Sequence, residues 1–205
     1  MEKEIYIIRH GQTDYNKRRI IQGRGVNSHL NEKGRQQATA FYEAYKHIKF
    51  DEIFTSSLIR TQQTVEPFIN IGYSYTPHEG LDEIDWGVHE GKPGNPALAK
   101  AYLAITSKWK NGDLHEKIPE GESPLELQAR QIQFIEETLK PLAVNKVLIC
   151  SHGRAIRILL CTLTGLSLSQ MDTFEHYNTC LYKVHYRNGA FEIVLHNSTE
   201  HLEKG

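Results

Sequence analysis

A short apolar run, Ile5-Tyr6-Ile7-Ile8, ends abruptly at Arg9-His10-Gly11. An uninterrupted apolar run of this length is typical of a strand that is buried on both faces of a parallel sheet. In open α/β sheets, ligands bind just outside the carboxyl ends of the strands. The sequence therefore predicts a guanidinium and an imidazole where a binding site would lie.

The same pattern recurs late in the chain, where Val147-Leu148-Ile149-Cys150 runs into Ser151-His152-Gly153-Arg154. If the two strands are neighbours in one sheet, the imidazoles of His10 and His152 come together at its edge. This pair of strand ends is the centre of the predicted site, and we interpret the rest of the chain as its scaffold.

Hydrophobic periodicity and capping signals predict an alternation of helices and strands around this pair. Further strands are expected at 52–56 and 73–76 and in a final hairpin, 179–186 with 190–196, around the Asn188-Gly189 turn. Helices are expected at 32–47, from 57 to near 72, and at 96–109, 124–139, 154–163 and 169–174. This alternation predicts an α/β fold of three layers, α/β/α, with a mostly parallel central sheet and a C-terminal antiparallel hairpin. The chain has no linker or repeat, so we expect a single domain over residues 1–205.

The charge balance and cysteine count restrict the partners. Lysine and arginine number 24 against 25 acidic residues, a formal charge of -1, which argues against a general nucleic-acid or anionic-membrane partner. No apolar run is long enough to span a bilayer, and the N-terminus does not resemble a signal peptide. The three cysteines have no paired metal spacing and are interpreted as reduced thiols. We expect a cytoplasmic protein with no metal or cofactor, no nucleic-acid partner and no membrane partner.

Several cation-capable or donor groups fall where a strand ends or the next helix begins. The strongest of them are Arg9, His10, Arg60 and His152. Such a group would bind an anion, and the arginine fork matches the oxygens of a phosphate. Backbone N–H groups near glycine and the neutral donors of the following loop would add to it, at Gly11, Gly153, Asn16 and Gln22.

An anion site becomes an enzyme if one imidazole is neutral and acts as nucleophile. Neighbouring arginines favour the neutral form because they disfavour a second positive charge. Attack by histidine on a phosphoryl group gives a phosphohistidine intermediate. The leaving oxygen then needs a proton, and a carboxylic acid of the glycine-rich loop 77–94 could supply it; the candidates are Asp82, Glu83, Asp85 and Glu90. Spacing alone does not choose among them.

A cysteine nucleophile is the alternative, because Cys150 also follows an apolar run. The spacing from Cys150 to Arg154 or Arg157 does not match that of a cysteine-dependent phosphatase. We therefore interpret Cys150 as a buried strand residue.

The motif Arg9-His10-Gly11-Gln12-Thr13 resembles the signature of the histidine phosphatase superfamily, in its phosphoglycerate mutase-like branch. The resemblance extends over nearly the whole chain. In order, it includes Gln22-Gly23, Ser56-Ser57 to Arg60-Thr61, Leu81-Asp82-Glu83-Ile84, Gly87 with Glu90-Gly91, Gly121-Glu122-Ser123, Ser151-His152-Gly153 and Asn178-Thr179.

The resemblance implies a role for each matching position. His10 would accept the phosphoryl group, and Glu83 would be the general acid and later the base that activates water. Arg9 and Arg60 would hold the phosphoryl oxygens, with His152 as a further donor. The remaining substrate-binding positions would be Asn16, Gln22, Gly23 and Gly153. No metal is implied, since protein cations supply the charge that Mg²⁺ supplies elsewhere.

These observations predict a metal-independent phosphatase that hydrolyses small phosphomonoesters through a phosphohistidine on His10. A phosphoglycerate mutase is the alternative with the same chemistry; the short chain argues against it, because mutases of the family are usually longer. A non-catalytic phospho-ligand binder is disfavoured, because every expected catalytic residue is present. The identity of the phosphomonoester stays open, and so does the oligomeric state, a homodimer included.

Two features of the loops bear on specificity. The run Asn27-Ser28-His29-Leu30 departs from the family pattern, which commonly has an Asp and a Pro-Leu-Thr run there. The loop is also basic, so it could attract a substrate with several negative groups, or it could be a solvated surface. Its cations are Lys17, Arg18, Arg19 and Arg24. Trp86, His89 and Tyr102 are candidates for the pocket wall, whereas His29, His176 and His185 are expected to be ordinary polar residues.

Overall fold

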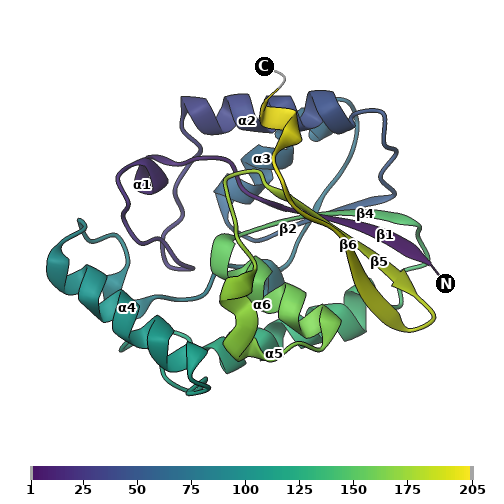
Figure 1. Ribbon diagram of the computed structural model, residues 1–205. Coiled ribbons are helices and arrows are strands. Elements are labelled where there is room, and N and C mark those ends of the chain that lie inside the picture. Colours follow the sequence, from purple (N-terminus) through teal and green to yellow (C-terminus); the bar gives the residue numbers. More distant parts are fainter. Residues whose placement is uncertain (1, 204–205) are drawn as a thin grey trace.

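A computed structural model describes residues 2–203 of the chain as one mixed sheet of six strands with helices on both faces (Figure 1). The strands are β1 (Lys3–Arg9), β2 (Glu52–Thr55), β3 (Thr76–Pro77), β4 (Lys146–Ser151), β5 (Leu181–Arg187) and β6 (Ala190–Ser198). Their spatial order is β3-β2-β4-β1-β5-β6. The first four in this order run parallel, and β5 and β6 pair antiparallel with their neighbours. The predicted three-layer α/β fold with a C-terminal antiparallel hairpin is confirmed.

The apolar run of β1 is buried because both of its faces are covered. Ile5 and Ile7 point into the core beneath α5 (Pro124–Phe134) and α6 (Gly153–Thr164). Tyr6 and Ile8 point into a second core. Alternate side chains of a strand lie on opposite faces, so a strand covered on both sides is apolar throughout.

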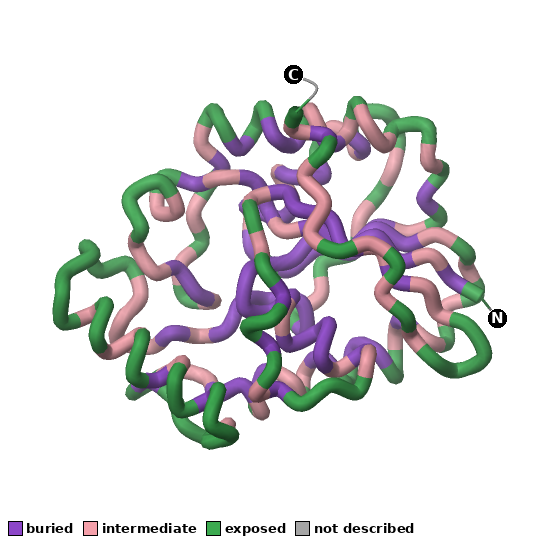
Figure 2. The backbone as a smooth tube through the Cα atoms, viewed as in Figure 1, coloured by how far each residue is buried: buried purple, intermediate pink, exposed green. Residues whose placement is uncertain are grey.

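The second core lies beneath α2 (Glu32–Tyr45) and α3 (Ile59–Ile69), on the opposite face of the sheet (Figure 1). Two further helices, α1 (Asp14–Lys17) and α4 (Pro96–Lys110), lie to one side of the sheet. Burial follows these layers: the central strands β1, β2 and β4 are mostly buried, whereas the first turns of α4 and the segment before it are exposed (Figure 2). Of the helices within residues 2–203, none is both long and apolar enough to span a bilayer.

Helix ends follow the local signals in the sequence. The Asn31 side chain accepts a hydrogen bond from the Gly34 N–H at the start of α2, and Ser123 forms a capping box at the start of α5. Gly165 ends α6 in the left-handed region, with φ of 72°. The Asn188-Gly189 turn also has positive φ at both residues, as a two-residue hairpin requires.

The structure corrects or refines several predicted segments. The strand expected at 73–76 is only β3, because the chain reaches the edge of β2 at Thr76. The helix expected at 124–139 changes to a π turn, η3 (Ile135–Leu139), and the segment 169–174 is a 3-10 helix, η4 (Leu168–Thr173). The predicted loop 77–94 contains the 3-10 turns η1 (Glu79–Leu81) and η2 (Gly87–His89), and α1 lies between residues 9 and 31, where no helix was predicted. A hydrophobic pattern does not distinguish an α-helical turn from a π or a 3-10 turn, because the three differ only in which carbonyl oxygen each backbone N–H donates to. A last 3-10 turn, η5 (Glu200–Leu202), follows β6.

Parallel pairing of β1 with β4 brings the two His-Gly motifs together. Arg9 lies opposite Ser151 in the register, so His10 and His152 follow the ends of adjacent strands. Their ring centroids are 5.1 Å apart. The prediction that the two strand ends meet is therefore confirmed.

The segment after β1 is held against α2 by contact of backbone with backbone. A Cβ atom on Gly34 would lie 2.1 Å from the Gln12 carbonyl oxygen, and one on Gly11 would lie 2.5 Å from the Gly34 carbonyl oxygen. The Gln12 N–H also donates to the Gln37 side chain at 2.9 Å. Glycine at both positions allows the chain that follows His10 to lie on the start of α2.

We expect the Gly34→Ala variant to be less stable than the wild type by about 2 kcal/mol, because the new methyl group overlaps the Gln12 backbone. Inside a helix this change ordinarily stabilises, by about 1 kcal/mol, so the sign of the effect is diagnostic. The measurement is urea unfolding, with Thr39→Ala on the exposed face of α2 as control, expected within about 0.5 kcal/mol of wild type. A Gly34→Ala protein as stable as the wild type would contradict the close packing.

Candidate active site

A crevice of about 460 Å³ lies beyond the carboxyl ends of β1 and β4. Six of the predicted site residues line it: Arg9, His10, Asn16, Gln22, Glu83 and Gly153. The other three, Gly23, Arg60 and His152, lie behind this lining. The crevice also contains residues that the sequence did not single out as site residues, chiefly Arg154 and His176.

His10 is held with one ring nitrogen free to react. Its Nδ1 lies 2.7 Å from the Gly11 carbonyl oxygen, which can only accept, so Nδ1 carries the hydrogen and Nε2 carries a lone pair. Burial lowers the pKa of His10 well below its usual value, and the guanidinium groups of Arg60 and Arg9 lower it further. The Asn178 side chain donates to the His10 carbonyl oxygen at 3.1 Å and fixes the backbone. The imidazole is therefore neutral and oriented.

Arg9 has donor capacity that the protein does not use. Its Nη1 donates to His176 Nδ1 at 3.2 Å, while its Nε is buried without a hydrogen-bond partner among the described residues. Burying a donor without a partner costs free energy, so such groups usually mark a place that a ligand or water fills. An anion in the crevice would supply the acceptor.

Arg60 and His152 form a second layer behind His10. The Arg60 Nε–H donates to His152 Nδ1 at 3.1 Å, so His152 carries its hydrogen on Nε2, which donates to Ser56 Oγ at 2.7 Å. The two terminal nitrogens of Arg60 donate to the carbonyl oxygens of Val26 and Gly23. Burial and the Arg60 charge lower the pKa of His152 well below its usual value. Both side chains are committed to the protein in this structure.

Glu83 is the carboxyl group that enters the crevice. Its oxygens accept from the backbone N–H groups of Arg154, at 3.2 Å, and Ala155, at 2.9 Å, at the N-terminus of α6. A helix N-terminus favours a negative group because its first N–H groups have no partner within the helix. The carboxyl group is thereby oriented toward the same space as His10.

The other three candidate acids are engaged elsewhere. Asp82 accepts from the Ser57 backbone and hydroxyl, at 2.7 and 2.8 Å, and Asp85 accepts from the Gly87 N–H at 2.7 Å. Glu90 accepts from the Trp86 N–H at 2.8 Å. None of the three lines the crevice among the described residues. The geometry of the crevice thus distinguishes Glu83 from the other three candidates, which their spacing in the sequence does not do.

Arg154 and His176 enter the crevice although the sequence analysis gave neither a site role. Arg154 is 4% exposed, and its guanidinium donates to Asp172 at 2.6 Å and to the Tyr102 hydroxyl at 3.1 Å. His176 lies so close to Gly153 that a Cβ there would be 2.9 Å from its ring. Position next to the His152-Gly153 motif was the available signal for Arg154. His176 precedes the Asn178-Thr179 match but carries no pattern of its own.

The candidates for the pocket wall also divide into residues that line the crevice and residues that do not. Trp86 and Tyr102 line the crevice and lie with ring centroids 5.1 Å apart. His89 and His185 are not among the lining residues. Within residues 2–203, no three His, Cys, Asp or Glu side chains are grouped as a metal site would require.

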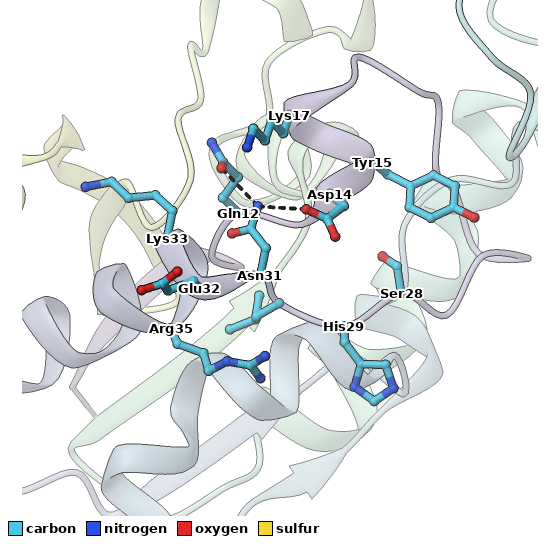
Figure 3. A pocket seen from close by; sticks show the side chains of 11 residues that line it. Gln12, Asp14, Tyr15, Lys17, Ser28, His29, Asn31, Glu32, Lys33 and Arg35 are labelled. Atoms are coloured by element: carbon cyan, nitrogen blue, oxygen red, sulfur yellow. Dashed lines mark hydrogen bonds between the residues drawn. The ribbon is translucent and has the colours of Figure 1, made fainter.

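A larger hollow of about 750 Å³ lies between α1 and the start of α2 (Figure 3). Its side chains carry both signs of charge, with Lys17 and Arg35 beside Asp14 and Glu32. It contains His29 but neither of the two paired histidines and no carboxyl group from the loop 77–94. Size alone would select this hollow, but His10 and Glu83 lie in the smaller crevice.

Comparison with known proteins agrees with this geometry. A family model described as the histidine phosphatase superfamily, branch 1, matches residues 5–199. The chain belongs to this superfamily. A probable phosphoglycerate mutase, GpmB, of Yersinia pestis is 32% identical over 189 residues, which cover 92% of this chain and 87% of that protein.

Solved structures of phosphatases share the fold. The phosphoserine phosphatase of Entamoeba histolytica, a mutant in complex with phosphoserine, has a TM-score of 0.85 at 26% identity and covers 98% of this chain and 99% of its own. The α-ribazole phosphatase of Shigella flexneri has a TM-score of 0.83 at 22% identity, with 95% and 96% covered. The second likeness shows the fold alone. Similar proteins therefore include both a named mutase and named phosphatases.

Glu90 holds the loop behind the crevice of this superfamily member. Besides the Trp86 bond, it accepts from the Gly23 backbone N–H, and a Cβ on Gly23 would lie 2.0 Å from its Oε1. Gly23 in turn accepts from Arg60. Burial raises the pKa of Glu90 to about 7, and the Asp85 carboxylate acts in the same direction.

Because the pKa of Glu90 is higher in the folded than in the unfolded chain, the stability it contributes is present below about pH 4.5 and is lost as the pH rises through about 7. Between pH 5 and pH 8, we expect the free energy of unfolding of the wild type to fall by about 1 kcal/mol more than that of Glu90→Gln. This value is reduced from the full effect of the pKa shift because Glu90 is partly exposed to solvent. Urea unfolding at both pH values measures it, with Glu137→Gln as control for the loss of one carboxylate. Parallel pH profiles for Glu90→Gln and wild type would disprove it.

Proposed function

We propose that the chain is a phosphoric monoester hydrolase that acts on small phosphorylated molecules through a phosphohistidine on His10. The observation that carries the proposal is the neutral His10, with the Nε2 lone pair free, in one crevice with Arg9 and the Glu83 carboxyl group. Membership of a superfamily of phosphatases and mutases supports the same chemistry.

In the first step, the Nε2 lone pair of His10 attacks phosphorus and the bond to the leaving oxygen breaks. Glu83, in its protonated form, gives its proton to that oxygen, so the product leaves as an alcohol. Arg9 faces the crevice with an unused donor and neutralises the phosphoryl oxygens. Asn16, Gln22 and the Gly153 backbone complete the binding of the anion.

In the second step, water attacks phosphorus, Glu83 takes the proton of that water, and the P–N electron pair returns to His10. The first N–H groups of α6 hold the Glu83 carboxyl group, so the same group serves in both steps. Arg60 and His152 contribute positive charge and hydrogen bonding from behind His10. Direct contact of either with phosphate requires exchange of its bonds to Gly23, Val26 or Ser56.

A phosphoglycerate mutase is the second candidate, because a relative with that name is 32% identical. Chain length does not separate the two, since the alignment covers 87% of that relative. Phosphatases among the similar structures favour hydrolysis: one of them is named for phosphoserine and another for glucosyl-3-phosphoglycerate. The cytoplasmic location and the single domain stay predictions.

The test is phosphate release from an aryl phosphate in excess EDTA. We expect wild type to turn over, His10→Ala to lose at least about 1,000-fold in kcat, and Glu83→Gln to lose about 100-fold or more. The control is His29→Ala, an exposed histidine outside the crevice. When the wild-type protein reacts with labelled substrate and the reaction is quenched in alkali, a labelled phosphoryl group should remain attached to the protein.

Each alternative has its own outcome. Phosphate release that His10→Ala does not affect would refute the proposed nucleophile. Transfer between phosphoglycerates without net phosphate release would establish the mutase instead. Tight binding of phosphate esters with neither reaction would point to a phospho-ligand binder.

A further inference from the structure

A second hollow of about 670 Å³ adjoins the catalytic crevice. The two share three lining residues, Arg19, Ile21 and Tyr102, so the second continues where the first ends. One side is the first half of α4, and the other is the segment from Arg18 to Ile21 with Lys92. Anything longer than a phosphoryl group that is bound at His10 can extend into it.

The wall of this hollow, which we call the α4 groove, is apolar. The first turns of α4 contribute Pro96, Leu98, Ala99 and Leu103 to it. Leu103 is 66% exposed, one of the most exposed large hydrophobic side chains in the described part of the chain. These positions recur at the spacing of one helix face, and no element of residues 2–203 covers them. An apolar chain or ring would gain by burial there.

The lining of the α4 groove also carries positive charge. Three cations line it, Arg18, Arg19 and Lys92, and no carboxyl group does among the described residues. None of the three side chains makes an ion pair or a hydrogen bond within residues 2–203. The charge is therefore available to a ligand.

The structure divides the basic loop into parts with different surroundings. Arg24 is paired with Glu79 at 2.7 Å and Asp82 at 3.3 Å. Lys17 lines the hollow at the start of α2 instead (Figure 3). Arg18 and Arg19 remain for the α4 groove, and Arg19 has φ of 55°, a conformation that non-glycine residues rarely adopt. Strained backbone of this kind is concentrated at binding sites.

We propose that the α4 groove binds the leaving group of the substrate, and that this group has an apolar body and carries a second anionic group. This inference rests on the proposed phosphatase function and names its substrate class: extended phosphomonoesters with a terminal carboxylate or phosphate. The phosphoryl group is bound at His10 and Arg9, the apolar body lies on Leu98 and Leu103, and Arg18 and Lys92 receive the second anion. A small polyol phosphate would leave both the apolar wall and the cations unused.

The test compares pairs of compounds that differ only in the second charge: ω-carboxyalkyl phosphates with three to eight methylenes and their methyl esters. We expect kcat/KM to rise by about two- to threefold per methylene until the chain spans the groove. At low salt the acid should exceed its ester by about five- to tenfold, and 0.5 M salt should remove most of this preference.

Variants of the lining residues test whether the α4 groove causes the preference for acids and the dependence on chain length. In the double variant Arg18→Gln with Lys92→Gln, the ratio of acid to ester should fall to about one or two, whereas Lys17→Gln on the same loop should keep the wild-type ratio. Leu103→Gln should flatten the dependence on chain length. Leu166→Gln, which changes a leucine that is 42% exposed outside both hollows, should not.

Binding of the corresponding phosphonates, measured by calorimetry, separates failure of this inference from failure of the phosphatase function. Tighter binding of the carboxylated phosphonate supports the groove whether or not phosphate esters are hydrolysed. Equal binding of the acid and ester phosphonates overturns it, even if both phosphate esters are hydrolysed. A dimer that Leu103→Gln dissociates would also overturn it, because a second copy of the chain would then cover the groove.

Discussion

The parallel pairing of β1 with β4 is the constraint on which the rest of the structure depends. It places Arg9 opposite Ser151, and the residues that follow, His10 and His152, therefore meet at one edge of the sheet. Both strands are covered on both faces, so neither can shift by one residue without turning its apolar side chains to the wrong core. Packing of the whole sheet thus sets the distance between the two imidazoles.

Around this pair, positive charge and burial act together. Burial lowers the pKa of both rings, and the neighbouring arginines lower it further, so the ring proposed as nucleophile is kept neutral without a separate base. The N-terminus of α6 instead favours a negative group, and its backbone N–H groups hold the Glu83 carboxyl group. One crevice thereby contains the Nε2 lone pair of His10, the Arg9 side chain with an unused donor, and the Glu83 carboxyl group.

The proposed chemistry and the proposed specificity depend on different parts of the molecule. The reactive groups follow strand ends and the start of α6, which are buried and rigidly paired. The α4 groove is built from an exposed helix and a basic segment outside the sheet (Figure 1). Changes in α4 can therefore alter the fit of a leaving group without moving His10, as is common for loops on a rigid scaffold.

The sequence by itself determined the fold class, the two histidine-bearing strands, the helix caps and the hairpin turn. Each of these depends on local signals: an apolar run, a capping side chain, or a pair of residues that accept positive φ. It did not separate Glu83 from Asp82, Asp85 and Glu90 by spacing, because the direction of a loop side chain is set by what packs against it. Nor did it distinguish a π turn from an α-helix.

Only the tertiary structure decided which groups enter the crevice. It placed His176 inside the crevice, and Arg60 and His152 behind the crevice lining. It also placed Arg18 in the α4 groove and the neighbouring Lys17 in the hollow at the start of α2. These outcomes depend on contacts between residues far apart in the chain, such as that of Gly153 with His176. A single sequence names the reactive groups because their chemistry is local, whereas their exposure and partners are properties of the packed molecule.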